Sequence, residues 1–241
     1  MDDYLYSSAS GLAAIHRALE NSTYNTVNAN TPGFQRNRVI FQNFGSFLED
    51  SGRAQNLIAA KETVSFQQGS LRNSELPYSV ALEGKGFLTV RSAEGETLYT
   101  RNGDLMTDAQ GRLRTRRGDD VLDSRDDPIV IDPFAGAISI DRQGAIVQGN
   151  KEIARLKIVE FEGDSRSRLE SASETLYRAP KDLEAEDATD TLVHHKYLEM
   201  PKFTGVHGTI EMLTAKKNFE SMQRAIMTLD RAQEALIRGV Q

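Results

Sequence analysis

The spacing of apolar residues predicts a helix at each end of the chain and a middle of different structure. From Asp3 to Val27 there is no proline, and two series of residues recur every seven positions. Interleaved, they give the alternating three-and-four spacing of an a/d seam, the pattern of a helix that pairs with another helix. The two series are Leu5, Leu12 and Leu19, and Ser8, Ile15 and Ser22.

The predicted N-terminal helix is followed directly by residues that end helices. Pro32 disfavours helical backbone at Thr31, and Gly33 adopts a positive φ at little cost. We interpret the segment as a stop and a turn. The residues of this helix-stop motif are Asn28, Asn30, Thr31, Pro32, Gly33 and Phe34.

The C-terminal segment repeats the heptad pattern more regularly, and a helix is predicted from Thr209 to Ile237. One series runs Met212, Phe219, Ile226, Gln233 and Val240, and the other runs Ala215, Met222, Leu229 and Leu236. We predict that apolar seam residues of the two helices form an assembly interface. This interface comprises Leu5, Leu12, Ile15, Leu19, Met212, Ala215, Phe219, Met222, Ile226, Leu229, Leu236 and Val240.

Two arrangements of these helices fit the pattern. They could pack on each other within one globule, or they could also contact helices of other chains. A two-helix pair leaves much of each helix surface unpaired, so small and apolar residues on the flanking faces favour further neighbours. These flanking residues are Ala13, Ala14, Ala18, Ala225 and Met227.

The middle of the chain, from about Phe66 to Tyr197, changes to a period of two. Short alternating runs separated by glycine-containing turns, with no helical stretch between them, predict an all-β barrel or sandwich. The predicted strands are 78–82, 87–91, 97–101, 128–131, 137–140, 145–147 and 154–161.

The predicted fold class is therefore α+β, with terminal helices pairing as a coiled-coil-like assembly domain around a central all-β domain. The predicted domains are an N-terminal assembly helix and turn (1–34), an extended connector (35–65), the β domain (66–197) and a C-terminal assembly helix (198–241).

Composition excludes several classes of function. Hydrophobic residues make up 39% and charged residues 27%, and no apolar run approaches the roughly 20 residues of a membrane span, so we expect no membrane insertion. The net charge of -6 argues against nucleic-acid binding. The absence of cysteine excludes disulfides and thiolate chemistry. An acidic start without a basic n-region makes a cleaved signal peptide unexpected.

Candidate chemical sites are weak. Adjacent His194 and His195 on a strand point to opposite faces, so only one could join His207 at a metal. Gly84–Gly86 precedes no helix, so it is read as a turn and not a phosphate cradle. The sequence contains no nucleophile elbow. We expect no catalytic residue, metal or cofactor, and no enzyme.

Two clusters of charged residues each allow two interpretations. The acidic pairs at 119–120 and 126–127 could hold calcium weakly, although EF-hand spacing is absent. The basic cluster Arg112–Arg117 either marks a charged strand edge or forms a contact with another protein.

Three blocks of the chain resemble the bacterial flagellar axial family of rod and hook proteins. The first is "SSASGLAAIHRALENSTYNTVNANTPGFQR". The second is "FQQGSL" followed by "LPYSVALEGKGFLTV" and "LYTRNGDLMTDAQGRL". The third is "TIEMLTAKKNFESMQRAIMTLDRAQEALI". The chain length and the segment "EIARLKIVEFEGDSRSRLESASETLYRAP" are most similar to the proximal rod type, with a distal rod or hook-type protein as the alternative.

This resemblance implies a structural subunit whose terminal helices stack with those of neighbouring subunits into a tube. It implies other copies of itself and other rod proteins as partners. It also implies export by the flagellar type III apparatus without a cleaved signal, and a place in the basal body in the periplasmic space. The helix-stop motif would be where the chain leaves the inner wall.

A hypothesis of another class is a soluble module whose β domain binds a carbohydrate or a protein and whose helices only oligomerise it. A closed small oligomer would indicate this module, whereas filament growth would indicate the rod subunit. A hydrolase using loop aspartates is the weakest reading.

Overall fold

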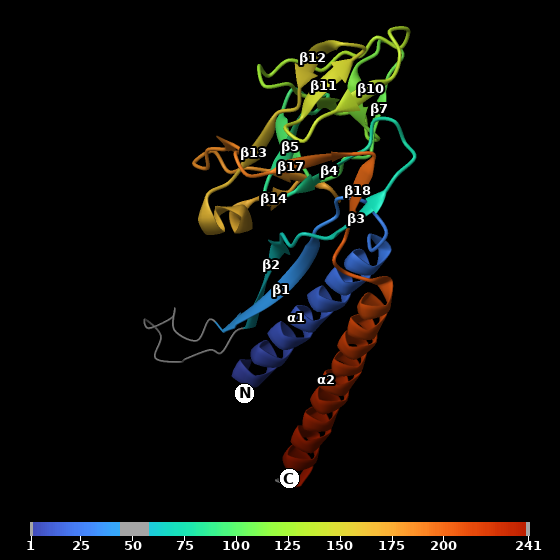
Figure 1. Ribbon diagram of the computed structural model, residues 1–241. Coiled ribbons are helices and arrows are strands. Elements are labelled where there is room, and N and C mark those ends of the chain that lie inside the picture. Colours follow the sequence, from blue (N-terminus) through green and yellow to red (C-terminus); the bar gives the residue numbers. More distant parts are fainter. Residues whose placement is uncertain (1, 44–57, 240–241) are drawn as a thin grey trace. The chain divides into compact units, whose positions relative to one another are not determined.

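The computed structural model describes residues 2–43 and 58–239 (Figure 1). The described residues form two long helices, α1 (Asp2–Val27) and α2 (Gly205–Gly239), with many short strands between them. The predicted α+β class is therefore confirmed. The chain divides into two compact units. The helical unit comprises 1–27, 37–63 and 204–241, and the β unit comprises 28–36 and 64–203.

In the helical unit, α1 and α2 lie side by side (Figure 1). The Ser22 hydroxyl of α1 donates a hydrogen bond to the Gly208 carbonyl of α2 at 3.2 Å. Further along the pair, the rings of His16 and Phe219 lie 6.3 Å apart. No helix among the residues described is long and apolar enough to cross a membrane.

Helix α2 begins at Gly205, four positions before the predicted start at Thr209. The cause is the preceding residue, Thr204. Its hydroxyl accepts the His207 backbone N–H at 3.4 Å, and its carbonyl accepts the N–H of Gly208 at 3.1 Å. This N-terminal capping satisfies amides that would otherwise lack partners, so the helix tolerates two glycines in its first turn.

The predicted connector holds two paired strands, β1 (Arg36–Asn43) and β2 (Ile58–Ser65). Residues 44–57 between them lie outside the described part. The side chain of Asn25 on α1 bonds both backbone groups of Asn37 in β1, as the backbone of a neighbouring strand would. Its side-chain amide donates to the Asn37 carbonyl at 2.8 Å and its oxygen accepts the Asn37 N–H at 3.0 Å. The buried asparagine thus joins helix and strand.

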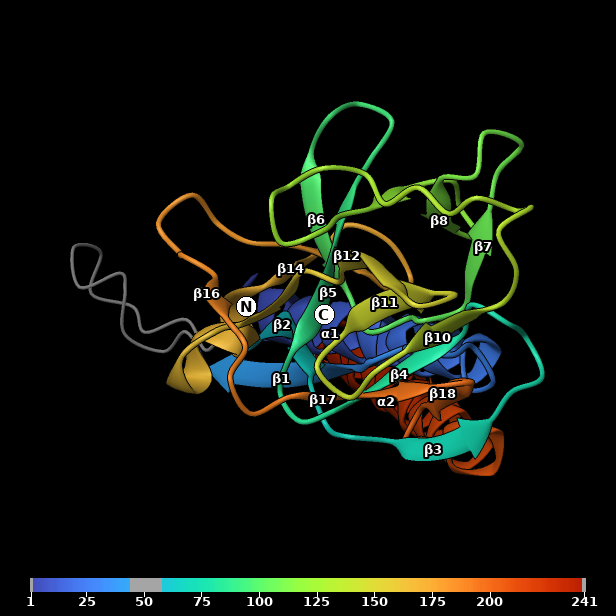
Figure 2. The same cartoon turned by 45° about the horizontal axis from the view of Figure 1, so that its top comes forward.

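The β unit is built from short antiparallel strands in several sheets (Figure 2). One sheet has the order β14-β15-β6-β5-β9-β8-β7, with β13 pairing β5 and β16. Another has the order β10-β11-β12, and β17-β4 and β18-β3 form pairs. The two strand pairs consist of β3 (Ser70–Asn73), β4 (Val80–Glu83), β17 (Leu192–His195) and β18 (Tyr197–Met200). The large sheet contains β5 (Phe87–Arg91), β6 (Thr97–Thr100), β7 (Leu105–Thr107), β8 (Leu113–Thr115), β9 (Asp120–Val121), β13 (Ile158–Glu160), β14 (Glu170–Ser171), β15 (Leu176–Arg178) and β16 (Glu186–Asp187). The three-stranded sheet contains β10 (Ile138–Ile140), β11 (Ala145–Gln148) and β12 (Lys151–Arg155).

Strand β5 is buried on both faces because it separates two cores. Leu88 and Val90 belong to an aliphatic core, whereas Phe87 belongs to an aromatic one. In the aromatic core the Phe87 ring meets the Phe161 ring edge-on at 5.8 Å, a favourable geometry for two aromatic rings. The presence of apolar residues on both faces of this strand is thereby explained.

Several predicted strands differ from those observed. Residues 128–131 make only isolated bridges, and Pro128 has no N–H to donate to a strand ladder. The predicted strand 154–161 is divided between β12 and β13. The change of partner explains the break, since the Leu156 N–H donates to the Gly144 carbonyl and the Lys157 N–H donates to the Leu122 carbonyl. A short 3-10 helix, Gly163–Arg168, also lies where no helix was expected.

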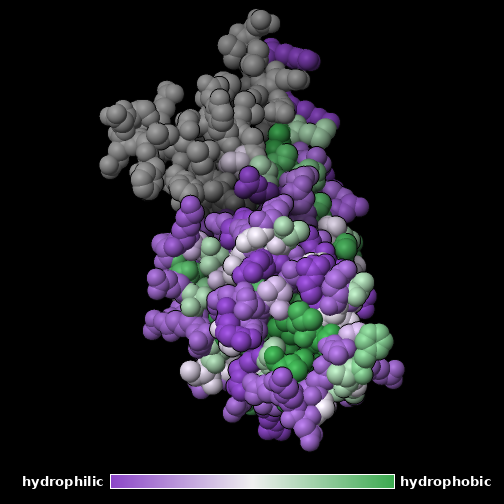
Figure 3. Space-filling model, turned by 90° about the horizontal axis from the view of Figure 1, so that it is seen from above, coloured by the Kyte–Doolittle hydropathy of each residue, from purple (hydrophilic) through white to green (hydrophobic). Residues whose placement is uncertain are grey.

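The face of the molecule in Figure 3 is mostly hydrophilic and carries one compact hydrophobic cluster. In the β unit, the described large apolar residues with exposed side chains are Leu76, Met106, Val130, Phe134 and Leu192.

Candidate assembly surface

The predicted seam residues of α2 occupy one half-buried stripe. Met212, Ala215, Phe219, Met222 and Ile226 are each half-buried, whereas most residues between them are exposed. Gly208, at the start of the same stripe, is buried and contacts α1 through Ser22. Leu229 and Leu236 lie on α2, but their side chains are outside the description, and Val240 lies outside the described residues. A role for these positions between subunits stays a prediction.

On α1 the most buried face consists of small residues. Leu12, Ile15 and Leu19 are half-buried, and the Leu5 side chain is outside the description. The buried positions are instead Gly11, Ala14, Ser22 and Asn25. Small side chains let a neighbouring backbone approach closely, which the Ser22 contact with α2 illustrates. Among these residues, Ser22 was part of the predicted seam and Ala14 was expected on a flanking face.

Helix α2 carries a second apolar stripe that is exposed. Val206, Ile210 and Leu213 are 71%, 57% and 51% exposed, and Met227 is 54% exposed. At about 100° per residue, this stripe lies on the side of α2 opposite the seam. Sequence reasoning missed its first three members, although their spacing of four and three was a visible signal. The exposed stripe has the width and spacing that a further helix would cover.

The helix-stop motif belongs to the β unit. Gly33 has φ +70°, and its N–H donates to the Glu199 carbonyl of β18 at 2.8 Å. A Cβ added to Gly33 would lie 2.2 Å from the Asn102 nitrogen, so no larger residue fits without displacement. Phe34 and Asn28 are buried, Thr31 and Pro32 are half-buried, and Asn30 is exposed. The motif therefore ends α1 and also packs into the β unit.

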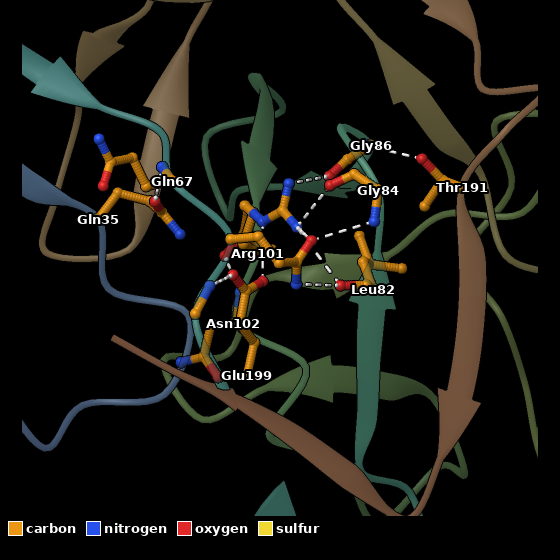
Figure 4. Close-up of polar contacts among 12 residues, drawn as sticks. Gln35, Gln67, Leu82, Gly84, Gly86, Arg101, Asn102, Thr191 and Glu199 are labelled. Carbon is orange, nitrogen blue, oxygen red and sulfur yellow. Dashed lines mark hydrogen bonds and ion pairs between the residues drawn. The ribbon is translucent and has the colours of Figure 1, made fainter. Parts of the chain in front are cut away.

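Beside the motif lies a buried ion pair that sequence reasoning did not single out (Figure 4). The Arg101 Nε donates to the Glu199 carboxylate at 2.8 Å, and their side chains are only 3% and 1% exposed. The Arg101 Nη groups also donate to the carbonyls of Gly84 and Gly86 at 3.0 and 3.1 Å. Gly69 donates its N–H to the other Glu199 oxygen at 2.9 Å. Both charges are thus almost fully hydrogen-bonded, as burial requires.

The basic cluster Arg112–Arg117 is neutralised within the β unit. Its arginines pair with acids from neighbouring turns and strands, which accounts for its charge without an external partner. The pairs are Arg112 with Asp108 (2.9 Å), Arg114 with Asp120, Arg116 with Asp104, and Arg117 with Glu174 (2.7 Å).

The histidines considered as metal ligands have separate partners. The His194 Nε2 lies 2.6 Å from the Glu83 carboxylate, and the His195 Nε2 lies 2.8 Å from the Pro77 carbonyl. His207 is on α2, where its Nδ1 contacts the Thr204 hydroxyl. Within the described ranges, no three His, Cys, Asp or Glu side chains gather as a metal site would need.

Asp123 is one of several acidic groups of the β unit whose pKa is lowered. Burial raises the pKa of Asp123, but the backbone N–H groups of Asp127 and Arg125, with the Arg125 guanidinium, outweigh this effect and leave the pKa below its usual value. The contacts brace a turn before Pro128. The role is structural, because each partner lies within the same loop.

Comparison with known proteins gives these features a context. The family model described as "Flagellar hook protein FlgE/F/G D1 domain" matches residues 81–148, from β4 to β11. The "Flagellar basal-body rod protein FlgF" of Caulobacter vibrioides is 27% identical over 228 residues, 93% of this chain and 92% of that protein. The chain is thus similar to flagellar basal-body rod proteins over most of its length.

Other relatives of the rod family match over a similar span. FlgF of Salmonella typhimurium is 25% identical over 244 residues, 95% of each chain. FlgG of Caulobacter vibrioides is 26% identical over 263 residues, 96% of this chain and 97% of that one. The resemblance inferred from the three sequence blocks is confirmed. The family consists of structural proteins and not of enzymes, so the expectation that the chain is no enzyme is confirmed as well.

Proposed function

We propose that this chain is a structural subunit of the flagellar basal-body rod, of the proximal FlgF type, and that it polymerises through its terminal helices. Full-length similarity to FlgF proteins supports the rod assignment. Similarity to FlgG proteins keeps the distal rod type as the alternative within the same class. The observation that carries the mode of assembly is that α2 has two apolar stripes on opposite sides.

The first stripe supports coiled-coil-like pairing of α1 with α2 within the subunit. Its residues from Met212 to Ile226 follow the heptad spacing and are half-buried. Pairing with α1 leaves them only half covered, so neighbouring subunits would complete their burial in the assembled rod.

The second stripe would be covered by a helix of another subunit. Burying an apolar side chain fully contributes about 1.5–3 kcal/mol, so Val206, Ile210 and Leu213 together supply a useful but modest contact. A contact between two different surfaces repeats from subunit to subunit without closing, which yields a helical tube. Many weak contacts then add to one stable shaft.

The remaining parts of the proposal follow from this role. Partners are other copies of the chain and other rod proteins, and the flagellar type III export apparatus delivers it without a cleaved signal. It resides in the basal body where the rod crosses the periplasmic space. We retain 1–34 and 198–241 as assembly segments, 35–65 as the connector and 66–197 as the β domain, with the helix-stop motif and β18 as the parts of the assembly segments that pack into the β unit.

Charge on the exposed stripe tests the proposal. In cells lacking the native gene, Leu213→Asp should be made and exported, yet absent from purified basal bodies, and the cells should not swim. Asn218→Asp is the matched control, since Asn218 is exposed on α2 and lies about 140° around the helix from Leu213, and this variant should support swimming. Normal swimming with Leu213→Asp would refute assembly through this stripe. Basal bodies that lack even the unaltered protein would refute the rod assignment itself.

A further inference from the structure

The backbones of two ion-paired residues together form a seat for the segment that follows α1. Glu199 supplies the carbonyl that accepts the Gly33 N–H at 2.8 Å. The Arg101–Asn102 peptide lies directly beneath Gly33, with its atoms 2.2–2.5 Å from where a Cβ would stand. The segment is therefore held between the main chains of Arg101 and Glu199, at the point where φ is +70°.

The side chains of the same two residues link those main chains. The Arg101 guanidinium and the Glu199 carboxylate meet at 2.8 Å, and both side chains are almost completely buried (Figure 4). The carboxylate also holds Gly69, and the guanidinium holds the turn at Gly84 and Gly86. Charge-assisted bonds with this many fixed partners leave little freedom to either residue.

A second contact holds the same segment to the same loop. The Gln35 side-chain oxygen accepts the Gln67 backbone N–H at 3.2 Å, and Gln35 and Phe34 are buried. Residues 66–69 thus contact both the segment and the ion pair. The segment 28–36, although adjacent in sequence to α1, is held by the β unit.

We propose that Arg101 and Glu199 are positioning residues that clamp segment 28–36 to the β unit, and that a rod subunit assembles only when this clamp is closed. The second half of this proposal, that assembly requires the closed clamp, rests on the proposed function. The first half, that the ion pair holds segment 28–36, concerns the purified subunit alone. The clamp would ensure that the chain leaving the assembly helix is fixed before neighbouring subunits pack around it.

Amide hydrogen exchange, followed by NMR on the purified full chain, tests the first half. In Glu199→Gln the side chain keeps its size but leaves the Arg101 charge buried without its counterion. The Gly33 amide should then exchange at least about 100-fold faster. The Leu122 amide, which is bonded to the Thr89 carbonyl in the core, should change much less. A role in general stability would accelerate both amides equally.

Matched variants keep the test decisive. Glu174→Gln removes an acid from an exposed ion pair, with Arg117, on the same unit and should leave the Gly33 amide unchanged. If Glu199→Gln does not fold, Gly33→Ala places a Cβ against the Asn102 backbone without altering the ion pair. Amide exchange should then become faster in 28–36 alone. Unchanged exchange at Gly33 in a folded Glu199→Gln protein would overturn the clamp. Equal acceleration of the amides at positions 33 and 122 in Gly33→Ala would overturn it as well.

Basal bodies test the second half. Glu199→Gln at a temperature where the β unit remains folded should be exported but not incorporated, whereas Glu174→Gln should be incorporated normally. Incorporation of a variant with a fast-exchanging Gly33 amide would overturn the requirement for a closed clamp. Failure of the unaltered protein to enter basal bodies would instead refute the proposed function and leave the exchange result standing.

Discussion

Two methionines on α2 allow the half-buried and exposed stripes to be compared with one substitution. Met222 lies in the half-buried stripe facing α1, and Met227 is 54% exposed near the opposite side. Met222→Asp and Met227→Asp place the same charge on the same helix, five positions apart. Any difference between them therefore reflects the surroundings of the side chain.

The cost at each position can be estimated from its exposure. Complete burial of methionine contributes about 1.5–3 kcal/mol, so the half-buried Met222 would lose roughly 1 kcal/mol of apolar burial. Desolvating a polar group without a partner adds about 1–3 kcal/mol there. At the exposed Met227 only the poorer helix propensity of aspartate remains, about 0.5 kcal/mol.

In the dilute subunit, Met222→Asp should accelerate amide exchange along both α1 and α2, whereas Met227→Asp should leave it nearly unchanged. At concentrations that allow assembly, both variants should fail to form sedimenting polymer, because both stripes are needed there. If Met222→Asp exchanges like the unaltered subunit, the α1–α2 pair does not depend on this stripe. If Met227→Asp polymerises normally, the exposed stripe is not an interface.

Three further predictions concern the β unit. Because its pKa is lowered on folding, Asp123 should add stability that is present above the usual carboxyl pKa and lost as pH falls through the lowered value. Urea unfolding should accordingly show a smaller decrease in stability below about pH 4 for Asp123→Asn than for the native chain. Gly103→Ala should lower the urea midpoint sharply, since its Cβ would lie 1.8 Å from the Val80 carbonyl oxygen, whereas Gly149→Ala meets nothing within 4 Å and should lower it only modestly. A fragment of residues 64–196 lacks Glu199, β18 and segment 28–36, so it should show no cooperative melting, whereas the full chain should.

Local pattern accounts for much of what was predicted. The heptad series of α2 follows its half-buried positions because a helix with one covered side must repeat apolar residues with that period. Strand β5 was found at its observed bounds because glycine-containing turns flank a short run rich in β-forming residues. The early start of α2 was missed because two glycines outweighed the capping potential of Thr204, which only its hydrogen bonds reveal.

The partners of single polar residues could not be predicted. Arg101 and Glu199 are 98 positions apart, and neither sits in a periodic series that indicates burial. The helix-stop motif was recognised by its proline and glycine, but those residues indicate only a turn and not which surface receives it. Many strands of the β unit are two to four residues long, too short for an alternating pattern to stand out.

The division of the sequence between the two units constrains how the gene could be recombined. The β unit is encoded in two separate stretches, 28–36 and 64–203, and the helical unit in the three stretches around them. A chimaera that takes only the long stretch from a relative would place the native Gly33 region against a foreign environment at positions 102 and 199. Transplanting both stretches together preserves every contact of Gly33 with its seat. Exchange of β units among rod proteins would thus require three coordinated crossovers, near Val27, Arg36 and Thr63, in addition to one near Phe203.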